Sequence, residues 1–132
     1  MIFVDADAYI GIYTKQDGHH NRANILLCGV QNNHEQLVTS WDVIDEVATK
    51  LSYHIGKAEA KNFLNDMKTS DTRIEYMKQE LVHDVFSLFL KQSSKHVSLT
   101  DCTNMVIARN LGITTFFSFD HHYEQNGFTL FR

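Results

Sequence analysis

The chain has 132 residues, 43% of them hydrophobic and 21% charged, which is typical of one folded domain and excludes disordered or collagen-like chains. The net charge of −4 argues against binding nucleic acid through bulk positive charge. Cys28 and Cys102 form neither a disulfide framework nor a paired zinc motif, and we expect Cys102 to be a small buried thiol. The sequence has no membrane-spanning segment and no secretory signal, so we expect a cytoplasmic protein.

Strand and helix patterns alternate along the whole chain. Taken in chain order, the apolar segments predict strands at 2–4, 37–39, 73–76, 114–119 and 128–131. Apolar residues at helical spacing predict helices over 8–13, 19–30, 41–55, 57–68, 78–91 and about 98–111, with a short helix after residue 120. Ser40 is a plausible N-cap, as is Ser98 or Thr100. The alternation predicts an α/β fold with parallel strands, formed by residues 1–132 as a single domain.

Acidic residues follow the apolar strands or lie in the first turns of helices. Asp5 and Asp120 each end a strand candidate, and Asp101 lies at the start of the helix near residue 98. Each could simply cap a helix or complement its dipole. A further acidic group, Asp42, Asp45 and Glu46, begins the helix after the second strand. Helical geometry does not choose among these three, and Glu46 points toward the polar side of its helix.

In a parallel sheet with right-handed crossovers, the ends of strands and the starts of the following helices share one edge. Carboxylates that converge there repel one another unless a cation joins them. Clustered oxygen ligands favour Mg²⁺ or Mn²⁺ over zinc. Such ions can activate water and stabilise the charge of phosphodiester attack, which predicts a metal-dependent hydrolase.

The ordered set of motifs resembles the PIN-domain family, and within it the VapC-type toxins of toxin–antitoxin modules. The matching segments are Phe-Val-Asp5, Thr-Ser-Trp-Asp-Val-Ile-Asp-Glu46-Val, Ser98-Leu-Thr-Asp101-Cys and Phe117-Ser-Phe-Asp120-His-His-Tyr. The resemblance covers essentially the whole chain. It implies a three-layer α/β/α sandwich around a mostly parallel sheet of four to five strands, and Mg²⁺- or Mn²⁺-dependent endoribonuclease activity.

Carried over position by position, the resemblance places the family's acidic, metal-binding and catalytic residues on Asp5, Glu46, Asp101 and Asp120. Thr100 matches the polar residue that helps to order the site. Asp7 departs from the family, which more often has Ser, Asn or Thr there, and we favour a capping or supporting role for it over metal binding. Basic residues are expected to offset the remaining repulsion, and the candidates are Lys50, Lys57, Lys61 and Arg109.

The resemblance also implies partners. The expected partners are an RNA substrate, a small antitoxin whose tail enters the acidic site, and a second copy of the chain in a homodimer. Three alternatives stay open: an RNA-processing nuclease outside a toxin–antitoxin pair, a non-catalytic RNA- or protein-binding module, and a DNA-cleaving relative. The last usually carries extra helices for which this chain has no room.

The histidines and glycines suggest no competing chemistry. The eight histidines include the adjacent pair His121 and His122. We expect both to be surface residues, and the alternative is that one of them contacts RNA or a phosphate near Asp120. The sequence has no HExxH motif, which leaves a zinc hydrolase poorly supported, and no glycine-rich phosphate loop.

Overall fold

The computed structural model describes all 132 residues and contains one five-stranded parallel sheet. The strands are β1 (Ile2–Val4), β2 (Leu37–Ser40), β3 (Arg73–Glu75), β4 (Thr115–Phe117) and β5 (Thr129–Leu130). They lie in the order β3-β2-β1-β4-β5, and every neighbouring pair is parallel. The expected α/β class and the number of strands are confirmed.

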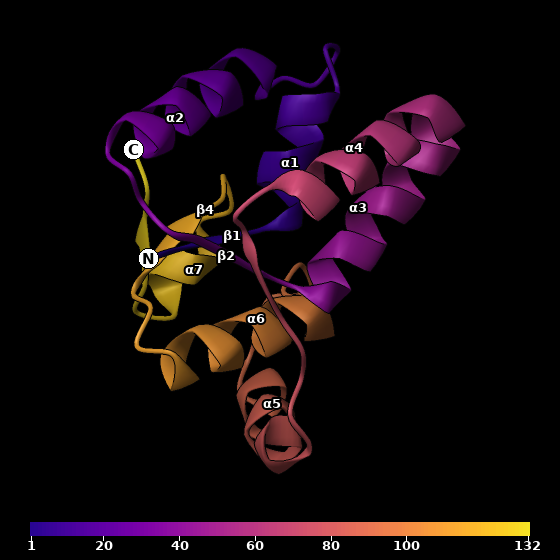
Figure 1. The fold of residues 1–132 in the computed structure, drawn as a ribbon. Helices are drawn as coiled ribbons and strands as arrows, with labels where there is room; N and C mark the ends of the chain where they lie inside the picture. The colour runs from indigo at the N-terminus through magenta and orange to yellow at the C-terminus, as the bar shows by residue number, and fades with distance from the viewer.

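Helices cover both faces of this sheet. They are α1 (Ala6–Tyr13), α2 (His20–Asn32), α3 (Trp41–His54), α4 (Lys57–Thr69), α5 (Val82–Leu90), α6 (Leu99–Asn110) and α7 (His122–Gln125). Figure 1 shows α1 to α4 gathered on one side of the sheet and α5 and α6 on the other, so the expected three layers are present. The helix expected over 78–91 begins instead with a 3-10 turn, Gln79–Leu81. No helix is both long enough and apolar enough to cross a membrane.

The hydrophobic core lies on both faces of the central strands. All three residues of β1 are buried, as expected for a strand covered on both sides. The Phe3 ring packs against Phe116 of β4, with ring centroids 5.0 Å apart. On the α1 side, Phe63 of α4 is fully buried against Tyr9 and Tyr13. This packing fixes the strand ends that carry the acidic residues.

Capping residues set where the site helices begin. Ser40 caps α3 by accepting a hydrogen bond from the Val43 N–H (3.1 Å), as predicted. Of the two candidates for α6, Ser98 is the cap, and it forms a reciprocal capping box with Asp101. Asp101 is thereby fixed in the first turn of α6, at the carboxyl edge of the sheet.

The strand order creates a crevice beside β1. From β1 the chain continues to β2 and β3 on one side, whereas β4 and β5 lie on the other. The point where the direction of winding reverses is the usual place for a ligand site in an open parallel sheet. Asp5 follows β1 directly, and its N–H donates to the carbonyl of Phe117, the last residue of β4 (3.1 Å). The two strands that flank the crevice therefore end beside each other.

Candidate active site

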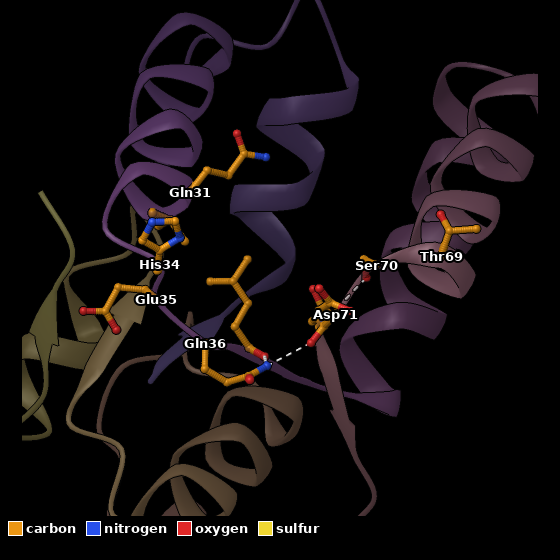
Figure 2. A pocket seen from close by; sticks show the side chains of 10 residues that line it. Gln31, His34, Glu35, Gln36, Thr69, Ser70 and Asp71 are labelled. Atoms are coloured by element: carbon orange, nitrogen blue, oxygen red, sulfur yellow. Dashed lines mark hydrogen bonds between the residues drawn. The ribbon is translucent and has the colours of Figure 1, made fainter.

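The largest cavity lies at the amino edge of the sheet, away from the predicted acidic site (Figure 2). It has a volume of about 530 Å³ and is lined by the segment before β2 and the segment before β3. Its polar contacts are structural, since the Gln36 side chain donates to the backbone carbonyl of Asp71 (2.8 Å). The residues that line it do not match any catalytic constellation, and we assign no activity to it.

A smaller cavity, of about 330 Å³, lies at the carboxyl edge and is lined by the predicted acidic residues. The carboxylates that line it are Asp5, Asp7, Asp17, Glu46, Asp101 and Asp120. They come from the β1–α1 junction, the loop after α1, α3, α6 and the segment after β4. Residues far apart in sequence thus meet at one site, and we call this group the acidic cavity.

Asp5 is the most deeply buried member of the acidic cavity, with 6% of its surface exposed. Its Oδ1 accepts a hydrogen bond from Asn104 Nδ2 (3.2 Å), and Asn104 in turn accepts from the Ser40 hydroxyl (2.7 Å). Burial, reinforced by the neighbouring Asp7 and Asp101 carboxylates, raises the pKa of Asp5 well above its ordinary value. The fold therefore holds a carboxylate where its charge is unfavourable without a cation.

Asp101 lies at the acidic cavity and beside the fully buried Tyr123. Asp101 Oδ2 accepts from the Ser98 N–H (2.7 Å), and its Oδ1 lies 3.5 Å from the Tyr123 hydroxyl. Burial, together with the charges of Asp5 and Asp101, raises the pKa of Tyr123 well above its ordinary value. The phenol therefore stays a neutral hydrogen-bond donor to the acidic group.

Asp7 and Asp120 lie where α1 meets the end of β4. Asp7 Oδ2 accepts from the Ser118 hydroxyl (3.0 Å) and the Phe119 N–H (2.7 Å), so it ties α1 to the segment that carries Asp120. Burial raises the pKa of Asp7, and its Oδ1 is buried without a hydrogen-bond partner. The Asp120 side chain is 49% exposed and accepts from the His122 N–H at Oδ1 (3.2 Å).

Glu46 lies at the rim of the acidic cavity and is 31% exposed, in keeping with its position on the polar side of α3. Its Oε1 is 2.6 Å from Lys50 Nζ one turn later. Lys50 is the only one of the four expected basic residues that lines this cavity. Lys57 and Lys61 line a separate hollow on α3 and α4, and Arg109 lies over the Phe128 ring, because these positions point away from the carboxyl edge.

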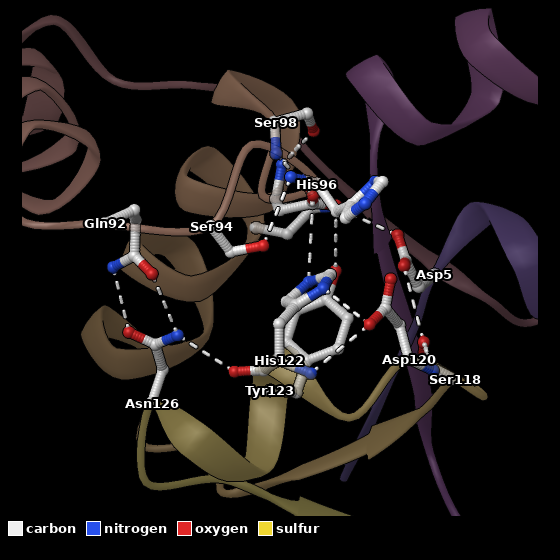
Figure 3. Close-up of polar contacts among 12 residues, drawn as sticks. Asp5, Gln92, Ser94, His96, Ser98, Ser118, Asp120, His122, Tyr123 and Asn126 are labelled. Carbon is white, nitrogen blue, oxygen red and sulfur yellow. Dashed lines mark hydrogen bonds and ion pairs between the residues drawn. The ribbon is translucent and has the colours of Figure 1, made fainter.

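The structure adds polar residues that the motifs did not single out. Asn104, Ser118 and Tyr123 are buried and hold the carboxylates, and His122 is also buried, with 6% exposed. The expectation that His122 is a surface residue is wrong, because the short helix α7 turns it inward (Figure 3). Its neighbour His121 is exposed, as expected. Thr100, next to Asp101, neither lines the cavity nor makes a side-chain hydrogen bond, and its ordering role stays a prediction.

The acidic cavity offers the donors that a hard divalent cation prefers. The Asp7 and Asp101 carboxylates repel that of Asp5, and Asp7 Oδ1 is buried without a hydrogen-bond partner. Both observations indicate uncompensated negative charge in the cavity. No three acidic, histidine or cysteine side chains are close enough together to enclose one ion. Mg²⁺ keeps several waters and needs only one or two direct carboxylates, so an open arrangement of this kind suits Mg²⁺ or Mn²⁺.

The family of the chain follows from a comparison with known domains. The model of the PIN domain matches residues 2–128, nearly the whole chain. The chain belongs to the PIN domain family. A search of curated proteins found no sequence match.

Solved structures agree with this PIN fold. One similar structure is the crystal structure of VapC20 from Mycobacterium tuberculosis, described as a sarcin-ricin loop cleaving toxin. The match covers 98% of this chain and 97% of that chain, with a TM-score of 0.87 and 21% sequence identity. At this identity the likeness establishes a shared fold.

Proposed function

We propose that this PIN domain is a divalent-metal-dependent endoribonuclease that hydrolyses RNA phosphodiester bonds. The observation that carries the proposal is the convergence of Asp5, Glu46, Asp101 and Asp120 on one cavity at the switch point of a parallel sheet. Membership of the PIN family and the shared fold with an RNA-cleaving toxin support the same activity.

The proposed roles follow from burial and position. Asp5, Asp101 and Asp120 would hold Mg²⁺ or Mn²⁺ directly or through water, and Glu46 would complete the group from the rim. A bound ion of this kind supplies an activated water and positive charge for phosphodiester attack. Asn104 and Ser98 keep the carboxylates of Asp5 and Asp101 in place, and no side chain forms a covalent intermediate.

The same proposal extends to the biological context. The enzyme acts as the toxin of a toxin–antitoxin module, in the cytoplasm, as a homodimer whose single nuclease domain spans residues 1–132. A small antitoxin inhibits it by placing its tail in the acidic cavity, where a basic side chain would satisfy the surplus negative charge. The fold shared with VapC20 supports this context. An RNA-processing role outside a toxin–antitoxin pair is the alternative.

Cleavage assays test the activity. The purified protein should cut RNA with Mg²⁺ or Mn²⁺, should lose activity in EDTA, and should leave a matched DNA oligonucleotide intact. Asp5→Asn and Asp101→Asn should lose at least about 100-fold in rate, since they remove proposed metal ligands. Asp45→Asn is the matched control, because this exposed acid on α3 does not line the cavity. Undiminished cleavage by the two folded variants would exclude the metal mechanism.

A growth assay tests the toxin context. Expression of the wild-type protein should arrest growth, and the toxin context predicts a short reading frame beside its gene whose co-expression relieves the arrest. RNA cleavage in vitro without growth arrest would favour the RNA-processing alternative. A folded protein that binds RNA but cuts nothing would instead indicate a binding module.

A further inference from the structure

His122 is a buried polar group beside the acidic cavity that the proposed metal chemistry does not use. It begins α7 and is 94% buried, since only 6% of its side chain is exposed. Its Nδ1 lies 2.8 Å from Asp120 Oδ1, and its Nε2 lies 3.7 Å from Asp101 Oδ2. Neither nitrogen makes an aligned hydrogen bond, and the carboxylates of Asp120 and Asp101 lie beside them (Figure 3).

The surroundings of His122 fix the ring where it lies. The imidazole packs on the Tyr123 ring, with centroids 4.3 Å apart and a tilt of 42°. Its backbone carbonyl accepts from Asn126 Nδ2 (2.8 Å), and Asn126 is paired in turn with the Gln92 side chain. Burial and packing on Tyr123 hold the ring in place, and the Asn126 contacts hold the backbone of α7 from which the ring extends.

Asp101 and Asp120 differ in how many contacts other than the His122 ring hold their carboxylates. The capping box and the Tyr123 hydroxyl already hold Asp101, which is 15% exposed. The Asp120 side chain is 49% exposed and accepts one hydrogen bond, from the His122 N–H, while the imidazole Nδ1 lies 2.8 Å from the same oxygen. An exposed carboxylate must lose rotamer freedom before it can bind an ion, and a fixed donor beside it reduces that cost.

We propose that His122 is a positioning residue that orients Asp120, and with it Asp101, for binding of a divalent cation. This inference rests on the proposed metal-dependent function. It assigns the orientation of the metal-binding carboxylates to a residue outside the acidic group. Removing a group that orients metal-binding side chains typically weakens metal affinity 10- to 100-fold. The role belongs to the inward-facing His122, not to its exposed neighbour His121, which pairs with Glu124.

Three variants separate orientation from packing. His122→Phe keeps a ring on Tyr123 but removes both nitrogens, whereas His122→Asn keeps an N–H donor close to the position of Nδ1. His121→Asn is the matched control on the adjacent, exposed histidine. Circular dichroism and thermal unfolding establish that each variant is folded.

The decisive readout is Mn²⁺ binding to the RNA-free protein by isothermal titration calorimetry. We expect His122→Phe to raise the Kd by about 10-fold or more. His122→Asn should restore most of the affinity, and His121→Asn should match the wild type. A folded His122→Phe protein with the wild-type Kd would overturn the positioning role and leave the proposed nuclease intact. A wild-type protein that binds no Mn²⁺ would overturn both.

Discussion

The buried amide of Asn104 offers the sharpest test of how the site is built. Asn104 is fully buried and joins Ser40 to Asp5 through two hydrogen bonds, of 2.7 Å and 3.2 Å. Asn104→Ala removes both bonds, each worth about 1 kcal/mol, and leaves buried partners unsatisfied at a further cost of about 1 to 2 kcal/mol. We therefore expect a loss of about 3 to 4 kcal/mol in unfolding free energy, or roughly 12 to 16 °C in Tm.

Urea unfolding and calorimetry measure this loss, with Thr103→Ala as the control. Thr103 is the preceding, also buried residue of α6, and its hydroxyl bonds only to the Leu99 carbonyl (3.0 Å). Thr103→Ala should cost about 1 kcal/mol and leave Mn²⁺ affinity unchanged, whereas Asn104→Ala should also weaken Mn²⁺ binding, because Asp5 loses its donor. A loss below about 0.5 kcal/mol for Asn104→Ala would refute this reasoning, since an unsatisfied buried partner costs more than that.

Three further predictions concern the same fold. Asp5→Asn should raise the Tm of the metal-free protein at pH 7 while abolishing cleavage. Burial holds the pKa of Asp5 high, so the native state loses stability as the pH rises above the ordinary carboxyl range. Thermal scans in EDTA at pH 4 and pH 7 should therefore show the gain in Tm at pH 7. Phe63→Ala should cost about 3 to 5 kcal/mol in urea unfolding because it empties a fully buried site, and a cost under about 1 kcal/mol would contradict the packing. Lys50→Met should change stability by less than about 0.5 kcal/mol, since the Lys50–Glu46 pair is largely exposed, and a larger loss would show that the pair is more than a surface contact.

The fold could be predicted from the sequence because its strands are short, apolar and separated by strongly periodic helices. The run Ile2–Val4 reads as a buried strand, and it is the central strand of the sheet. The alternation of elements then requires parallel pairing, which places Asp5, Asp101 and Asp120 at one edge. The choice between Ser98 and Thr100 as the cap needed the structure, because both residue types cap helices well.

The supporting residues of the site were harder to find. Asn104 lies three residues after Asp101 on α6 and therefore shares a face with it, a signal that could have been used. His122 carries no such signal, because the direction of a four-residue helix is set by packing of the Tyr123 ring against Phe116 and not by local pattern. Arg109 was placed wrongly for a similar reason, since its contact with Phe128 depends on the tertiary fold.

The measurement that tests the central claim most directly is a crystal structure of the protein soaked in Mn²⁺, with anomalous scattering to locate the ion. The account predicts an anomalous peak in the acidic cavity, at coordination distance from carboxylate oxygens of Asp5 and of Asp101 or Asp120, directly or through ordered water. The absence of a peak in the acidic cavity at saturating Mn²⁺ would contradict the account, provided that protein redissolved from the same crystals still cleaves RNA.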